Sequence, residues 1–403
     1  MICLLLVACQ GVSSDQLQGR ILLWHSWEGA DQELLDQVLD QFMEINPEVT
    51  IVSARIPEEQ LKTRYENSAP QGLGPNLIIG KSDWLPDWAR QDLIADYLVQ
   101  GVVSNNYTSE GLREVQIQGV TGLYGLPLSL STQVLYYNDD DVKLPPVDLN
   151  ALWVQAESGL PVAIPTNFSS GYWGIYAFGD GLFDKDGQFV LKRSGLAGWL
   201  TMMKEAQELS NVVFSRDPLL LRNLFIQGRV SYYVGRSDEW AFLREEIGDE
   251  VLGVALLPSG VIGLARPLVH AEVVMLSPAS SHAQKEVAVQ VARFLTNQEQ
   301  STRFMRELGR VPAHQRVEVN RQIEPRMATL VSQTRLGVSL PNSLPIQKIE
   351  EAGNLAYANV LLGIKTPDEA VCEFGRAVIM AAPRLGSEED LLPVNCLAEA
   401  GAE

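Results

Sequence analysis

The sequence predicts a two-lobed α/β protein, and three observations support this prediction. Over the first hundred residues, continuous apolar runs alternate with amphipathic helical segments, which is typical of a parallel sheet covered on both faces. An extended segment at 126–137 then leads into a second α/β pattern. The length of 403 residues exceeds what one hydrophobic core usually organises, so we expect two domains.

The first block alternates strands and helices in a regular order. Segment 31–46 places its apolar side chains on one helical face, with Asp31 as a candidate N-cap and Pro47 just beyond the end. Expected strands lie at 20–24, 48–56 and 75–80, and expected helices at 31–46, 57–69 and 86–98. Because crossovers between parallel strands are right-handed, the loops after these strands share one edge of the sheet, where such folds bind ligands.

The second block continues the mixed pattern. Alternating polar and apolar residues at 126–137 predict one long strand that runs out of the first lobe. Further helices are expected at 149–159, 196–210 and 219–227, and further strands at 161–166, 229–234 and 251–260. A long amphipathic helix pair at 283–308 ends at Gly309, and segment 318–383 is mostly helical. We find no internal repeat.

Charge and composition exclude several classes of protein. The 50 acidic and 31 basic residues give a net charge of −19, which argues against nucleic acid as a partner and against adhesion of the folded body to anionic lipid. Hydrophobic residues make up 46% of the chain, which is too apolar for a disordered protein. No segment beyond the N-terminus approaches the ~20 continuous apolar residues of a membrane helix.

The cysteines suggest an exported protein. Cys9 follows a short apolar run and precedes a polar linker, which resembles the end of a bacterial lipoprotein signal with Cys9 as the lipid-modified residue. No Lys or Arg precedes that run, so a frayed apolar N-terminus is the competing interpretation. Cys372 and Cys396 either form a disulfide or stay as two buried thiols. No C-x-x-C spacing, histidine cluster or phosphate loop is present, so we expect no metal and no cofactor.

Five motifs follow one another in a recognisable order. They are ILLWHSWEG, PNLIIGKSDWLPDWARQDLIADY, LYGLPLSLSTQVLYYN, LFIQGRVSYYVG and ARFLTNQEQSTRFMRELGRVPAH. Each motif alone is degenerate. Their order and intervals across 20–383 resemble the extracellular solute-binding proteins of ABC importers, in the sugar-binding branch that includes maltose-binding protein.

The resemblance implies a periplasmic-binding-protein type II fold, in which two α/β lobes enclose a ligand cleft. The implied division is a truncated lipoprotein signal and linker at 1–19, lobe 1 at 20–128 plus 268–311, lobe 2 at 129–267 plus 312–390, and a tail at 391–403. Crossing segments are expected near 128–133, 258–270 and 310–314.

The implied function is that of a non-catalytic substrate-binding component of an importer. It would capture a sugar or oligosaccharide in the cleft, close about a hinge and present the solute to a membrane permease. We expect a monomer in the periplasm or at the cell surface, in contact with a bacterial membrane only through its N-terminal lipid.

Sugar sites combine aromatic faces, which stack on pyranose rings, with polar groups that bind hydroxyls. By family position, the expected ligand-binding residues are Ser26, Trp27, Glu28, Lys81, Asp83, Trp84, Ser131, Gln133, Asn167, Tyr172, Trp173, Gly235, Arg236, Trp240 and His270.

Several of these positions also fit structural roles. Trp24 continues the alternation of its strand and is expected in the core, whereas Trp27 fits the core or the cleft equally well. The sequence does not decide whether His25 contacts the ligand. Asp83 also fits a helix cap beside a surface tryptophan, and His270 an interlobe structural role.

Other functions remain open at this stage. Glu28 and Asp83 would be the carboxylates of a glycosidase, but the sequence does not supply the separation that decides such a mechanism. Binders of ferric iron, polyamines or amino acids share the fold, and the pairs at 136–137 and 232–233 offer tyrosines for iron. Neighbours in a strand point to opposite faces, so two pairs of strand-core tyrosines are the simpler interpretation. A lipoprotein that senses or scaffolds without a ligand is a third class.

Overall fold

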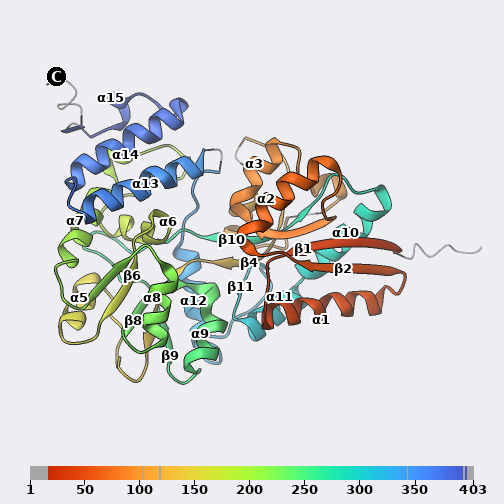
Figure 1. Ribbon diagram of the computed structural model, residues 1–403, viewed down its shortest axis with the longest axis horizontal. Coiled ribbons are helices and arrows are strands. Elements are labelled where there is room, and N and C mark those ends of the chain that lie inside the picture. Colours follow the sequence, from red (N-terminus) through yellow and green to blue (C-terminus); the bar gives the residue numbers. More distant parts are fainter. Residues whose placement is uncertain (1–16, 103, 118, 343, 394, 397–403) are drawn as a thin grey trace, which may run out of the picture.

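The computed structural model describes residues 17–396 except for residues 103, 118, 343 and 394. Cys9 therefore lies outside the described residues. The described chain forms two α/β lobes, each built on its own sheet (Figure 1). Within it, no helix is both long and apolar enough to cross a lipid bilayer.

Lobe 1 is built on a six-stranded sheet in the order β11-β4-β10-β3-β1-β2. Its strands are β1 (Gly19–His25), β2 (Val49–Arg55), β3 (Leu77–Lys81), β4 (Leu126–Ser131), β10 (His270–Leu276) and β11 (Val311–Pro312). β1 pairs in parallel with β2 and β3, as predicted, but β10 runs antiparallel to both β3 and β4. The sheet is therefore mixed rather than wholly parallel, because the chain re-enters lobe 1 in the opposite direction.

Six α-helices flank this sheet. They are α1 (Ala30–Ile45), α2 (Glu58–Ser68), α3 (Leu85–Arg90), α4 (Ser109–Val115), α10 (His282–Leu295) and α11 (Gln298–Leu308). α1 buries the apolar face predicted for it, including Leu35 and Phe42. α3 is shorter than the predicted helix at 86–98. It ends at Arg90, and Asp92 adopts a left-handed φ of 54°, which a continuing helix does not allow.

Lobe 2 is built on a five-stranded sheet in the order β7-β6-β8-β5-β9. Its strands are β5 (Gln133–Asn138), β6 (Val162–Pro165), β7 (Val212–Ser215), β8 (Tyr232–Arg236) and β9 (Leu252–Ala255). Its helices are α5 (Leu149–Glu157), α6 (Phe168–Gly171), α7 (Leu196–Ala206), α8 (Pro218–Ile226), α9 (Trp240–Ile247), α12 (Pro325–Leu336), α13 (Ile346–Leu361), α14 (Pro367–Ala381) and α15 (Glu388–Leu391).

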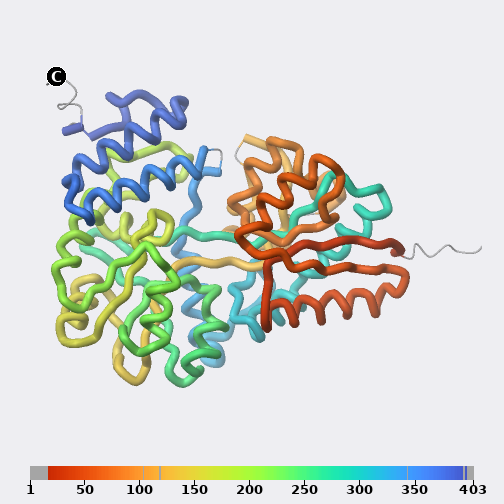
Figure 2. Tube along the Cα trace, in the orientation of Figure 1, coloured from red at the N-terminus to blue at the C-terminus, as the bar shows by residue number. Residues whose placement is uncertain are grey.

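The chain passes between the lobes at three places, which Figure 2 traces by colour. β4 and β5 belong to different sheets and only Thr132 separates them, so the predicted single strand at 126–137 is in fact two strands. The second crossing joins β9 to β10, and the third leads from β11 to α12. The first two crossings are tied together, because the Thr132 hydroxyl donates a hydrogen bond of 2.9 Å to the carbonyl of Leu268.

An apolar contact also joins the lobes beside the third crossing. Gly309 ends α11 at a left-handed φ of 66°. A Cβ at this position would lie 2.0 Å from Cδ1 of Trp240, the first residue of α9 in lobe 2. Glycine is therefore required here for both its backbone conformation and its lack of a side chain.

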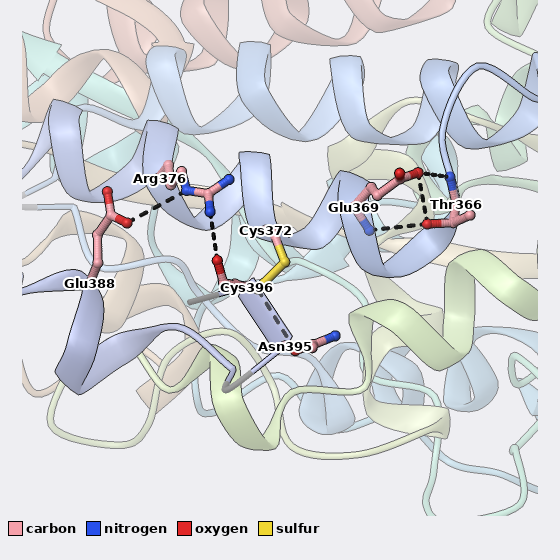
Figure 3. The surroundings of a disulfide bond; sticks show 7 residues. All are labelled: Thr366, Glu369, Cys372, Arg376, Glu388, Asn395 and Cys396. Carbon is pink, nitrogen blue, oxygen red and sulfur yellow. Dashed lines mark hydrogen bonds and ion pairs between the residues drawn. A yellow bond between two sulfur atoms is a disulfide. The ribbon is translucent and has the colours of Figure 1, made fainter. Parts of the chain in front are cut away.

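A disulfide fixes the C-terminal segment to lobe 2. Cys372 on α14 is bonded to Cys396, with 5.3 Å between the Cα atoms, which decides between the two alternatives left open by the sequence (Figure 3). Arg376 supports the same segment by donating a hydrogen bond of 2.7 Å to the Cys396 carbonyl. Leu392 is fully buried in the lobe 2 core. Leu392 and Cys396 therefore pack with lobe 2.

We expect Cys396→Ser to lower the free energy of unfolding by about 3 kcal/mol, since the bond closes a loop with a sequence separation of 24 and restricts the unfolded chain. Urea unfolding followed by circular dichroism measures this change. Asn395→Ala, at the exposed neighbouring residue, is the matched control. An unchanged urea midpoint in Cys396→Ser would show that the bond contributes nothing to stability.

Candidate ligand-binding cleft

Two adjoining hollows lie where the lobes meet. The first offers about 490 Å³ of open space and is lined by Ser82, Asp83, Pro86, Arg113, Glu114, Leu268, Val269, His270, Leu340, Asn342, Ile346 and Glu350. The second offers about 340 Å³ and is lined by Ser131, Thr132, Gln133, Ser169, Ser170, Arg236, Leu268 and His270. Because they share Leu268 and His270, the hollows form one cleft whose floor is the crossing segments.

His270 stands at the centre of this cleft, at the start of β10. Its Nδ1 lies 3.3 Å from Oδ1 of Asp83, in the loop after β3. Burial lowers the pKa of His270, but Asp83 and Glu114 outweigh it, so the net shift is upward. Burial raises the pKa of Asp83, while His270 and Lys81 together hold it below its ordinary value. Asp83 and His270 thus both favour their charged forms, and His270 belongs to the lining of both hollows.

Glu114, on α4, connects the lobes across the first hollow. Its carboxylate accepts a hydrogen bond of 3.0 Å from the Ser82 hydroxyl of lobe 1 and another from the Ser339 hydroxyl, which follows α12 of lobe 2. Burial raises the pKa of Glu114 to about 7, against the opposing effect of His270. A carboxyl group that titrates near neutral pH therefore lies on the contact between the lobes.

This carboxyl group predicts a pH dependence of stability. The pKa of Glu114 is higher in the folded protein, at about 7, than in the unfolded chain, where it is 4.5. The stability that this difference contributes is fully present below pH 4.5 and is lost as the pH rises towards about 7. We therefore expect the melting temperature of the wild type to fall more steeply than that of Glu114→Gln between pH 5 and pH 7.5. Glu110→Gln, on the same helix but outside the hollows, should keep the wild-type slope. Parallel curves for the wild type and Glu114→Gln would contradict the role of Glu114.

Arg236, at the end of β8 in lobe 2, lines the second hollow. Its Nε donates a hydrogen bond of 2.9 Å to Asp238, and its Nη2 donates one of 3.3 Å to Ser131 Oγ in lobe 1. Burial raises the pKa of Asp238, but Arg236 outweighs it and lowers this pKa to about 2. Nearby, Gln133 Oε1 is a buried carbonyl oxygen without a hydrogen-bond partner among the described residues, which leaves an acceptor for a bound hydroxyl.

The predicted aromatic platforms are not in the cleft. All eight tryptophans are buried, at 9% exposure or less, and no Trp, Tyr or Phe is among the residues that line the two hollows. Trp84 packs on Trp88, Trp240 packs beside Gly309, and Tyr172 and Trp173 lie in the lobe 2 core. None of these four residues lines either hollow, because each ring is buried against other side chains.

Gly235 also lies outside the lining of both hollows. A Cβ on it would lie 2.3 Å from the ring of Tyr233 and 2.9 Å from Glu239 Oε2. The glycine thus makes room for these two side chains.

The loop at 24–29 also differs from the prediction. Trp24 is in the core, as expected. Trp27 is buried too, and its indole donates a hydrogen bond of 2.5 Å to Glu272 while the Arg310 guanidinium lies 4.0 Å from its ring centroid. Glu28 is exposed and paired with Arg55. Neither it nor the half-buried Ser26 lines either hollow, so the loop borders lobe 1 without reaching the cleft described here.

His25 has a structural role. It is fully buried, and its Nδ1 accepts a hydrogen bond of 3.1 Å from the Trp27 backbone amide. Nε2 therefore carries the ring proton and donates a hydrogen bond to Ser53 Oγ, 2.9 Å away. Burial lowers the pKa of His25, which favours this neutral form.

Two other predicted residues lie apart from the hollows. Lys81 pairs with Glu58 at 2.5 Å, and Asn167 precedes α6 at its N-terminus. Two serines on α6 line the second hollow, and Glu114 and Glu350, on other helices, line the first. The lining residues that the sequence analysis did not predict include Arg113, Glu114, Ser169, Ser170 and Glu350. The pair of serines in NFSSGYWG was the one signal available for this group.

The tyrosine pairs alternate between two cores. Tyr136 and Tyr233 belong to one apolar cluster, while Tyr232 and Tyr137 pack in or against the other. Neighbours in each pair therefore point to opposite faces, as predicted, and cannot share one ion. Across the described residues, no group of three or more His, Cys, Asp or Glu side chains is placed to hold a metal ion.

Comparison with known proteins identifies the family. The family model described as bacterial extracellular solute-binding protein matches residues 37–328. The chain belongs to this family. A binding protein of Brucella abortus is 22% identical over 83% of this chain and 86% of its own length, and the maltodextrin-binding protein of Bacillus subtilis is 27% identical over 47% of this chain and 46% of its own.

Solved structures show the same fold. The GacH receptor of Streptomyces glaucescens, described unliganded and with acarbose, is 16% identical, has a TM-score of 0.80, and the match covers 91% of this chain and 99% of the receptor. The maltose/maltodextrin-binding domain of Bdellovibrio bacteriovorus, bound to maltotriose, is 18% identical with a TM-score of 0.75, over 90% and 99% of the two chains. The predicted type II fold is confirmed, and this solute-binding protein carries its cleft where the crossing segments meet.

Proposed function

We propose that this solute-binding protein is the capture component of an ABC importer and takes up a sugar or oligosaccharide. The observation that supports this most is the polar cleft on the crossing segments, where five predicted residues line the hollows: Asp83, Ser131, Gln133, Arg236 and His270. Carboxylate, amide, hydroxyl and guanidinium groups are the partners that sugar hydroxyls take. Relatives and structural neighbours named for maltodextrin, maltotriose or acarbose support the same class of solute.

Recognition in this cleft would rest on hydrogen bonds more than on stacking. The first hollow combines three carboxyl groups with His270 and apolar walls from Leu268, Leu340 and Ile346. The second is lined mainly by hydroxyl groups and Arg236. A sugar would place its hydroxyls against the charged wall and its C–H face against the apolar one.

The proposed setting is the outside of a bacterial membrane. The protein would act there as a monomer, without cofactor or catalysis, and deliver its solute to the transmembrane permease when the lobes close. An N-terminal lipid on Cys9 would hold it to the membrane. The family's extracellular character supports this setting.

A thermal-shift screen against mono- and oligosaccharides tests the proposal. A sugar that binds should raise the melting temperature by mass action, and Asp83→Ala should lose most of that rise because it removes the partner of His270. Asp87→Ala, on the exposed face of α3, should keep it. If no sugar stabilises the wild type, or Asp83→Ala responds fully, the proposed site or solute is wrong.

One alternative solute fits the same hollow. The carboxyl groups of Asp83, Glu114 and Glu350 would also accept an ammonium group, as in an amino acid or a polyamine. Adding these compounds to the screen separates the two classes, since stabilisation by them and not by any sugar would favour the alternative.

A further inference from the structure

Two loops in different lobes share a sequence pattern. GKSDW at 80–84 begins with the last two residues of β3, and GRSDEW at 235–240 begins with the last two residues of β8. Both read glycine, basic residue, serine, aspartate and then tryptophan, with one extra glutamate in the second. The two strands belong to separate sheets, so each lobe carries one copy.

The two loops also share a backbone conformation. The basic residues, Lys81 and Arg236, have φ/ψ of −85°/142° and −78°/143°. A 3₁₀ turn starts at the serine in each, over Ser82–Trp84 and Ser237–Glu239, and an α-helix follows directly. In both loops an extended residue is followed by a 3₁₀ turn, so the two serines occupy equivalent positions just after their strands.

Each serine holds a different crossing segment. Ser82 and Ser237 are buried, with 3% and 1% exposure. The Ser82 hydroxyl accepts a hydrogen bond of 3.1 Å from the amide of Ala271, the second residue of β10, directly after the second crossing. The Ser237 hydroxyl accepts one of 3.1 Å from the amide of Thr132, the single residue of the first crossing.

These contacts close into one network beneath the cleft. The Ser237 amide donates in return to the Thr132 carbonyl at 2.8 Å, and the Thr132 hydroxyl donates to Leu268 at 2.9 Å. The residue next to each serine lines a hollow, Asp83 in the first and Arg236 in the second. The loops that face the hollows are therefore hydrogen-bonded to the segments at the first two crossings.

We propose that Ser82 and Ser237 are paired positioning residues that fix the two crossing segments at the angle at which the lobes form the solute site. This proposal rests on the proposed function, since it assigns the serines to closure of the same cleft. Ser237 is outside the lining of both hollows, whereas Ser82 lines the first and uses its hydroxyl for Ala271 and Glu114. Ser237 is thus the cleaner position for a test.

Hydrogen–deuterium exchange on the ligand-free full chain provides the test. Ser237→Ala should raise the exchange rate of the Thr132 amide about tenfold and leave that of the Ala271 amide unchanged. Ser82→Ala should raise the exchange rate of the Ala271 amide and leave that of the Thr132 amide unchanged. In each case a buried amide loses its hydrogen-bond acceptor. Ser277→Ala removes a buried hydroxyl at the far end of β10 and should change neither amide. General destabilisation would instead raise exchange at both amides in every variant.

Solution scattering then tests the effect on the lobes. Ser237→Ala should show a larger radius of gyration than the wild type without ligand, while Ser277→Ala should match the wild type. Equal radii, or a Thr132 amide that already exchanges freely in the wild type, would overturn the proposal. Maltotriose added in a parallel experiment separates the two claims. Failure of the wild type to bind it counts against maltotriose as the solute and leaves the ligand-free results to decide the role of the serines.

Discussion

Replacing Arg310 by alanine is expected to lower the free energy of unfolding by about 3–5 kcal/mol, the loss typical of breaking a buried ion pair. The Arg310 side chain is only 12% exposed and pairs with Glu272 on β10 and with Asp31 at the start of α1, the latter at 3.2 Å. It also covers the ring of Trp27. Its removal leaves two carboxylates without their cation under the loop at 24–29.

Urea unfolding of Arg310→Ala and Arg306→Ala measures this loss. Arg306 is 66% exposed and pairs with Glu324 on the surface, so its removal should cost less than about 1 kcal/mol. The pKa of Glu272 is already raised, by burial and against the effect of Arg310, so the variant should recover part of its stability as the pH falls and Glu272 takes up a proton. Equal losses in the two variants would show that the buried cluster is not what stabilises this region.

His270→Ala is expected to weaken binding of a stabilising sugar by about 100-fold, since it removes a contact shared by both hollows and leaves Asp83 without its partner. Isothermal titration calorimetry at neutral pH measures the change in Kd. Because the pKa of His270 is raised above its ordinary value of 6.5, affinity that depends on its protonated form should decline as the pH rises through this raised pKa.

His282→Ala supplies the matched control for this variant. His282 is exposed at the start of α10, the helix that follows β10, and lines neither hollow. It should bind the sugar with the wild-type Kd. An affinity loss of less than about threefold in His270→Ala would remove His270 from the binding site, because a shared contact with a charged partner should contribute more than this.

The elements that could be predicted from the sequence are those with strong periodicity. The apolar face of α1 and the helix pair α10–α11 follow directly from residue spacing, and the first three strands are continuous apolar runs. The division at Thr132 could not be predicted, because no Gly or Pro separates β4 from β5 and only the tertiary structure assigns them to different sheets.

The candidate site was predictable only where it lies on strand ends. Asp83 follows β3, Arg236 ends β8, and both line the hollows, as the rule for ligand edges leads one to expect. The direction of the tryptophans could not be predicted, because Trp84 turns back over Gly80, where a Cβ would lie 2.2 Å from its ring. Glu114 and Glu350 come from helices of different lobes, and no local pattern marks residues that only tertiary packing brings together.

A crystal structure of the protein with the sugar that raises its melting temperature most is the most direct measurement. We predict that the sugar lies between the lobes, with hydroxyls on Asp83, Arg236 and His270 and with Leu268 beneath it. A sugar bound outside the two hollows, or one that contacts a single lobe, would contradict the proposed capture between the lobes.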